Sequence, residues 1–207
     1  PCFHIFYLIQ YSYVAFAMSV VPKQLYGAVA SSFHWIVAVP LIGCVGTVLK
    51  AQQAPKEEKG TWMFRHKSLG LLTGMVVAPR FAYRIFNRQA YNVTAVPGSS
   101  IEHGLASVTH LGLYAFMTIM PATGIAMGYY GGKGLPFFYT TLPGIVKTDE
   151  NQKSSGEIAK QSFQIHKQLG VYGKYLVPLH VGGAFVHYAR GHTIFSRVNP
   201  FAVRPKY

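Results

Sequence analysis

The chain has 207 residues, of which 50% are apolar and only 12% are charged, and its formal net charge is +13. The apolar residues lie in long blocks, whereas the helices of a soluble protein would carry a polar face along their length. This pattern argues against a soluble helical domain. Basic residues that flank apolar blocks commonly meet lipid headgroups, so the positive charge is not taken as a sign of nucleic-acid binding.

Four stretches are long and apolar enough to cross a membrane, which requires about 20 mainly apolar residues. They cover residues 25–49, 68–86, 105–127 and 169–189. We therefore predict an all-α fold, a multi-pass transmembrane four-helix bundle over residues 25–200 with a basic C-terminal tail at 201–207. Each predicted span contains one proline, at Pro40, Pro79, Pro121 and Pro178.

Residues 1–24 are apolar as well and leave three alternatives open: an additional spanning helix, a helix at the membrane interface, or the remnant of a targeting sequence. Cys2 and Cys44 are far apart in the chain and form no Cys-x-x-Cys motif, so neither a disulfide framework nor a cysteine metal site is expected. We expect Cys44 to be a packing residue.

Three loops connect the predicted spans, at residues 50–67, 87–104 and 128–164. The third is the longest, and it contains an apolar tract, LPFFYTTLPG, bounded by glycines and prolines. We expect this tract to fold back over the membrane surface and cover what lies beneath it.

Four of the nine histidines fall at matching depths if successive helices run antiparallel. We call the end where the first span begins side A and the opposite end side B. His34 lies near side A, and His66 begins the second span at side B. His166 lies at the side-B entrance of the fourth span, and His180 follows it by about 21 Å on nearly the same helix face. The spacing therefore pairs His34 with His180 and His66 with His166.

Two opposed imidazoles at one depth are what a six-coordinate haem iron requires. Gly70 and Gly170 follow His66 and His166 by four residues each, and we expect them to leave space for the ring edge. A single histidine would more simply be a packing or hydrogen-bonding residue, but ionisable groups inside a bilayer are costly and usually functional. The sequence thus predicts two haems b, with Arg65 near the side-B pair and Arg80 near the side-A pair as partners for their propionates.

Several runs resemble the helices of the bacterial-type cytochrome b561 family, and most closely its superoxide oxidase branch. The runs are SFHWIVAVPLIG, HKSLGLL with PRFAYRIF, HLGLYAFMTIMPATG, and HKQLG with LHVGGAFVHY. The resemblance implies that His34, His66, His166 and His180 ligate two b haems that pass electrons between superoxide and ubiquinone. Membrane cytochromes of hydrogenases and formate dehydrogenases share this layout, so it supports the fold and the haems more strongly than the reaction.

Two functions remain open at this stage, and the sequence assigns no catalytic residue. In the first, superoxide is oxidised at side B, where lysines attract the anion, and ubiquinone or plastoquinone is reduced. In the second, the chain is a haem-bearing subunit of a larger respiratory or photosynthetic membrane complex. His110 and His187 are candidates for bonding a propionate or a quinone, with packing as the alternative. The expected location is a bacterial-type inner membrane, or the mitochondrial inner membrane or a plastid membrane in a eukaryote.

Overall fold

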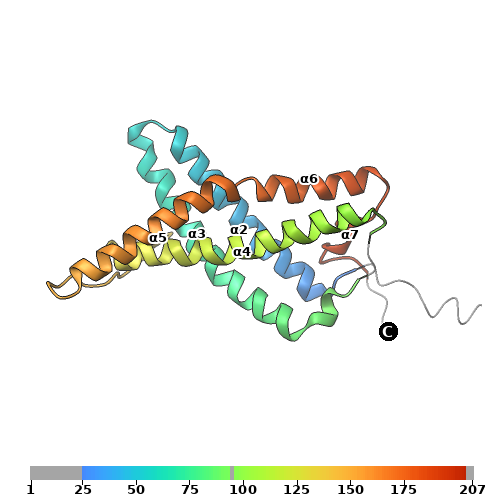
Figure 1. The fold of residues 1–207 in the computed structure, drawn as a ribbon, viewed down its shortest axis with the longest axis horizontal. Coiled ribbons are helices and arrows are strands. Elements are labelled where there is room, and N and C mark those ends of the chain that lie inside the picture. Colours follow the sequence, from blue (N-terminus) through green and yellow to red (C-terminus); the bar gives the residue numbers. More distant parts are fainter. Residues whose placement is uncertain (1–24, 94–95, 204–207) are drawn as a thin grey trace, which may run out of the picture.

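The computed structural model describes residues 25–93 and 96–203. The apolar segment 1–24 and the last four residues of the predicted tail lie outside this description. Within it, two long helical hairpins and a shorter helix form the molecule. Figure 1 shows the α2–α3 turn and the loop before α5 at one end, which is side B, and α7 with the start of α4 at the other.

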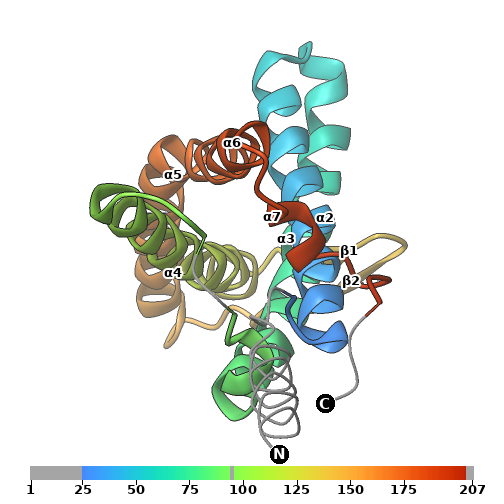
Figure 2. The same cartoon turned by 90° about the vertical axis from the view of Figure 1, so that its right-hand side faces the viewer.

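The first hairpin consists of α2 (Ala28–Gln53) and α3 (Lys56–Phe86). The second consists of α4 (Ser100–Tyr130) and α5 (Gln152–Gly173), and α6 (Leu176–Ala189) continues from α5 along α4. Figure 2 shows α2 and α3 on one side of the bundle and α4, α5 and α6 on the other. Among the described residues, α2, α3 and α4 are long and apolar enough to cross a membrane, so the first three predicted stretches form helices of the expected kind.

The predicted fourth span is wrong as a single helix, because the chain leaves the helix at Lys174 and Tyr175, between α5 and α6. Pro178 explains much of this break, since its ring would clash with the carbonyl four residues earlier, at Lys174. In the observed structure Pro178 lies in the first turn of α6, where a missing N–H costs no helical hydrogen bond. His166 and His180 therefore belong to two helices.

The helices also extend further at side B than the apolar stretches predict. The turn between α2 and α3 consists only of Ala54 and Pro55, so the predicted loop at 50–67 is mostly helical. The long loop is shortened in the same way, because α5 begins at Gln152. Glutamates in the first turn of α3 favour this extension by interacting with the helix dipole. His66 consequently lies about 15 Å inside α3 and not at its start.

The apolar tract of the long loop forms a small β-hairpin of β1 (Leu135–Phe137) and β2 (Thr140–Leu142). The hairpin folds back onto α3, as predicted. Ser68, which is fully buried, accepts a hydrogen bond from the Phe138 N–H at 3.0 Å and donates one to the Pro136 carbonyl at 3.4 Å. Ser68 lies two residues after His66, so the hairpin covers α3 beside that histidine.

Close backbone packing joins α2 to α3, α3 to α4, and α4 to both α5 and α6. The small buried core at the centre of this arrangement consists of Val37, Val77, Leu113 and Met117. Large apolar side chains elsewhere on the helices are exposed, as expected for surfaces that meet lipid. Two short elements, η1 (Arg88–Tyr91) and α7 (Ile194–Arg197), lie at side A.

At side A, hydrogen bonds to the backbone carbonyls at the end of α7 and just after it tie the C-terminal part of the chain to α2. The Ser31 hydroxyl donates to the Arg197 carbonyl at 3.1 Å, and the Trp35 indole donates to the Val198 carbonyl at 2.8 Å. A capping box at Ser99 and Glu102 begins α4. The bonds of Ser31 and Trp35 hold the first turns of α2 in place beside His34.

Candidate functional site

The side-A pair lies between α2 and α6. The ring centroids of His34 and His180 are 6.3 Å apart, with an interplanar angle of 44°, and both residues are partly buried. A third ring joins them, since His110 of α4 lies 5.1 Å from His180. The sequence places His110 at this end but does not predict its contact with His180. That contact depends on how α4 and α6 are rotated relative to each other, which in turn depends on the break before α6.

The side-B pair lies between α3 and α5, where the ring centroids of His66 and His166 are 6.1 Å apart at an angle of 76°. Each ring is fixed by a neighbouring helix. The Nδ1 atom of His66 lies 3.0 Å from the Cys44 carbonyl oxygen of α2, and that of His166 lies 3.1 Å from the Met120 carbonyl oxygen of α4. The other ring nitrogen is thereby left for a ligand.

Both separations suit one metal atom between two imidazoles. Bonds of about 2 Å from metal to nitrogen, with about 1.1 Å from that nitrogen to the ring centre, place two opposed ring centres about 6.2 Å apart. The observed values of 6.3 and 6.1 Å fall on either side of this figure. The predicted partners are therefore brought together at a distance that permits axial ligation.

The residues around the two histidine pairs favour a metal that brings most of its own ligands, as the iron of a haem does, over a bare metal ion. In the described part of the chain, no cluster of three or more histidine, cysteine, aspartate or glutamate side chains could hold a bare metal ion. The helices that carry the paired histidines, α2 with α6 and α3 with α5, scarcely approach each other through their backbones. The imidazoles are therefore the side chains through which each helix pair would hold a flat group such as a haem from two sides.

An unpaired cation supports the same interpretation at side A. The Nε atom of Arg80 is buried and has no hydrogen-bond partner among the described residues. A buried guanidinium N–H without an acceptor is costly, so a bound anion such as a haem propionate would satisfy it. Arg80 is partly covered by Tyr114, whose ring centroid lies 6.0 Å from the guanidinium carbon.

Comparison with protein families decides the identity. A family model described as prokaryotic cytochrome b561 matches residues 25–199. The chain belongs to the prokaryotic cytochrome b561 family. As a member it is a membrane protein that binds haem b and transfers electrons, which confirms the resemblance seen in the sequence. Comparison with curated proteins finds no match.

The predicted cations near the side-B pair of this b561 protein lie at the surface. Arg65 is exposed, and its guanidinium lies over the Trp62 ring, 4.6 Å from the centroid. Lys67 and Lys167 are also exposed and follow His66 and His166 directly in the chain. The structure shows no contact of Arg65 with either histidine, so its predicted role toward a propionate stays a prediction.

The predicted glycines face neighbouring helices. A Cβ atom at Gly70 would lie 3.5 Å from the Cys44 sulfur, and one at Gly170 would lie 3.6 Å from the Met120 methyl carbon. Gly124 of α4, which sequence reasoning missed, lies closer to the site, because a Cβ atom there would lie 3.4 Å from Cε1 of His166. The interhelical register that gives Gly124 this place has no local signal in the sequence.

Side A carries a further polar group that the sequence did not place. The Nδ1 atoms of His187 and His192 are 3.2 Å apart, so one ring donates to the other. Arg190 forms an ion pair with Glu102 at 2.5 Å, which joins the end of α6 to the start of α4. His187 therefore lies at the same end of the molecule as the side-A pair.

Proposed function

We propose that this protein holds two haems b, on the side-A and side-B pairs, and passes electrons between superoxide and a quinone. The observation that carries the proposal is the presence of two separate imidazole pairs at two depths of one bundle, with ring centroids 6.3 Å apart in the side-A pair and 6.1 Å apart in the side-B pair. Each haem would supply a one-electron iron couple. His34, His180, His66 and His166 would be the axial ligands.

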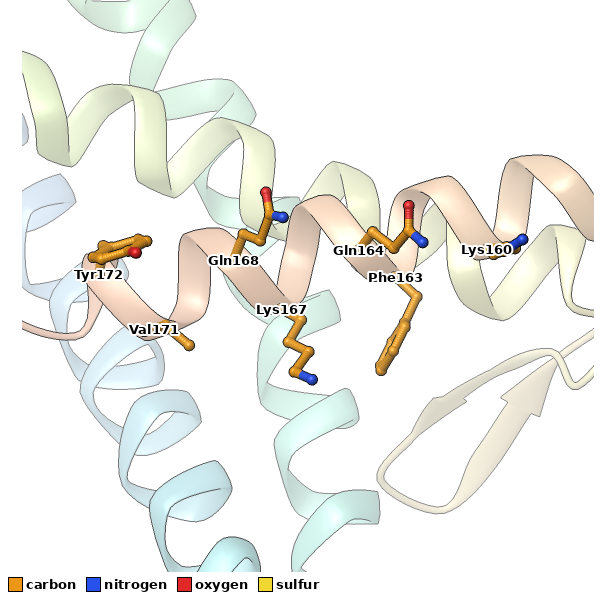
Figure 3. Close-up of a pocket in the computed structure, with 7 residues that line it drawn as sticks. All are labelled: Lys160, Phe163, Gln164, Lys167, Gln168, Val171 and Tyr172. Atoms are coloured by element: carbon orange, nitrogen blue, oxygen red, sulfur yellow. The ribbon is translucent and has the colours of Figure 1, made fainter.

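At side B, exposed lysines near His66 and His166 would attract a small anion. An open surface hollow of about 710 Å³ lies along α5, and His166 is not one of its lining residues. It is lined by Lys160, Phe163, Gln164, Lys167, Gln168, Val171 and Tyr172. Figure 3 shows Lys167 and Phe163 extending from the same side of α5, with Gln164 and Gln168 on the other. Two lysines seven residues apart lie about 10 Å from each other along one helix face. Superoxide approaching side B would meet this positive field.

At side A, the quinone would bind near the His34 and His180 rings. Carbonyl oxygens of a quinone need hydrogen-bond donors, and reduction adds protons as well as electrons. His110 and His187 are two imidazoles at this end that are not assigned to iron. We propose them as quinone or propionate partners, with ubiquinone or plastoquinone as the acceptor.

A second function is that of a haem-bearing subunit in a larger respiratory or photosynthetic membrane complex. The β-hairpin favours it, because the Tyr139 side chain at its tip is fully exposed and Val146, just beyond β2, is 79% exposed. Partner contacts commonly cover such apolar groups. We propose that the protein is multi-pass, in a bacterial-type inner membrane or the corresponding mitochondrial or plastid membrane.

Salt and charge distinguish the two functions. We would purify the protein, follow haem reduction by superoxide in stopped flow, and change Lys67, Lys160 and Lys167 together to glutamine. If the protein is a superoxide-oxidising enzyme, the triple variant should be reduced more slowly than the wild type at low salt. This difference in rate should shrink as the Debye length falls from about 10 Å at 0.1 M to about 3 Å at 1 M.

The matched control changes Lys50, Lys56 and Lys59 to glutamine, because these lysines are exposed near the α2–α3 turn and further from His66. Haem content and reduction by a neutral quinol should be unchanged in both triple variants. If the rate of haem reduction by superoxide depends neither on salt nor on the change of Lys67, Lys160 and Lys167, electrostatic steering of superoxide is contradicted. If the pure protein also fails to reduce quinone and migrates with a large complex, the subunit role is the correct one.

A further inference from the structure

The two histidine pairs differ in how their outer ring nitrogens are held. At side B, Nδ1 of His66 and Nδ1 of His166 each face a backbone carbonyl, of Cys44 at 3.0 Å and of Met120 at 3.1 Å. A carbonyl oxygen can only accept, so each Nδ1 must carry the proton. Nε2 then keeps its lone pair, which is the form of imidazole that binds a metal.

A side-chain atom shares each of these protons. The Cys44 sulfur lies 3.3 Å from His66 Nδ1, and its own proton points to the His66 carbonyl at 3.5 Å. The Thr123 oxygen lies 3.0 Å from His166 Nδ1, while its hydroxyl proton is donated to the Ile119 carbonyl at 2.8 Å. Both side chains therefore present lone pairs to the ring N–H.

The side-A pair has no equivalent support. Within the described part of the chain, neither His34 nor His180 has a hydrogen bond to a ring nitrogen, and the cation Arg80 lies nearby with an unpaired Nε. Acceptors on the outer N–H make an imidazole a stronger donor and stabilise the oxidised metal. A neighbouring cation has the opposite effect, because it stabilises the added electron.

We propose that Cys44 and Thr123 are positioning residues for the side-B pair, fixing its tautomers and holding its iron couple at a lower reduction potential than the side-A couple. This inference rests on the proposed ligation of haem by His66 and His166. Two haems held in this way would give the molecule a direction. One electron would pass downhill from the side-B couple, which would be oxidised, to the side-A couple, which would be reduced.

The test is a spectroelectrochemical titration of the purified holoprotein. Thr123→Val removes the acceptor oxygen with little change of shape, and Cys44→Ala removes the sulfur. Each change should raise the side-B midpoint potential by up to about 59 mV. For one electron, that shift corresponds to a tenfold change in the ratio of reduced to oxidised iron. Thr123→Ser keeps a hydroxyl and should restore the wild-type value. The low-spin ferric resonance of the same centre should shift with the midpoint.

Thr118→Val is the matched control, because Thr118 lies on α4, donates to the Tyr114 carbonyl at 2.9 Å as Thr123 does to its own helix, and forms no hydrogen bond with a described histidine. His66→Ala identifies the side-B component as the one that disappears. Unchanged midpoints in both Thr123→Val and Cys44→Ala, or a side-B couple above the side-A couple, would overturn the inference. Two haem components remaining in His66→Ala would instead overturn the proposed ligation. If Thr123→Val loses haem, Cys44→Ala and Thr123→Ser still decide the question.

Discussion

Removal of one axial histidine should remove the haem of its pair and no other. His66→Ala and His166→Ala share a site 6.1 Å across, so either change leaves one iron with a single protein ligand. We expect the pyridine haemochrome to fall from two haems per chain to one, and the residual spectrum and midpoint to be the same in both variants. His34→Ala and His180→Ala should spare the other haem.

Double variants make the test stricter, because effects within one site are not additive. His66→Ala with His166→Ala should match either single change, whereas His34→Ala with His66→Ala should lose both haems. His103→Ala is the control, since His103 is exposed near the start of α4 and should keep full haem content. If His34→Ala and His66→Ala left the same residual haem, the pairing would be wrong.

Three further changes test other parts of the structure. Arg80→Gln should lower the side-A midpoint potential, because it removes a positive charge that favours the added electron. A unit charge at about 10 Å from an iron, with an effective dielectric constant of about 20, contributes about 1.7 kcal/mol, or about 70 mV, and a redox titration measures this shift. Gly173→Ala should lower the thermal stability in detergent by about 1–3 kcal/mol, because a Cβ atom there would overlap the Phe116 ring. Ser68→Ala should free the β-hairpin from α3, at a cost of about 1–3 kcal/mol for the unsatisfied Phe138 N–H, and hydrogen exchange at Phe138 should rise.

Each of these changes has a control of the same kind in the chain. Arg88→Gln removes an exposed positive charge at the same end and should leave both midpoints in place. Gly182→Ala adds a Cβ atom that meets nothing within 4 Å, so it should not lower the stability as Gly173→Ala does. Ser154→Ala removes an exposed hydroxyl near the start of α5 and should not change exchange in the hairpin. A midpoint shift in Arg88→Gln equal to that in Arg80→Gln would mean that long-range charge alone is responsible.

Hydrophobic length and helix geometry were sufficient to predict the first three long apolar helices and the proximity of the paired histidines. Both properties follow from local rules, since rise per residue converts sequence distance into depth. The depth argument gave the right neighbours even though one assumption in it was wrong. His166 and His180 do not share a helix face, because the chain breaks between α5 and α6.

The sequence could not give the contacts that distinguish the two pairs. The bonds from His66 to Cys44 and from His166 to Thr123 cross between helices, so they depend on interhelical register and on rotation about each axis. Cys44 was expected to be a packing residue, and its contact with a ring nitrogen adds a polar role. The extension of α3 back to Lys56 was missed because polar residues can continue a helix beyond the lipid.

The break in the last helix has a structural consequence for the two ends of the molecule. α3 carries His66 near side B and Arg80 fourteen residues later near side A, so one continuous helix sets a distance of about 21 Å between them. His166 and His180 are also fourteen residues apart, but the turn at Lys174 and Tyr175 lies between them. A straight helix would have fixed the rotation of both rings together. Because α5 and α6 are separate, each imidazole can meet its partner independently, with His166 held by α4 at side B and His180 left beside His110 at side A.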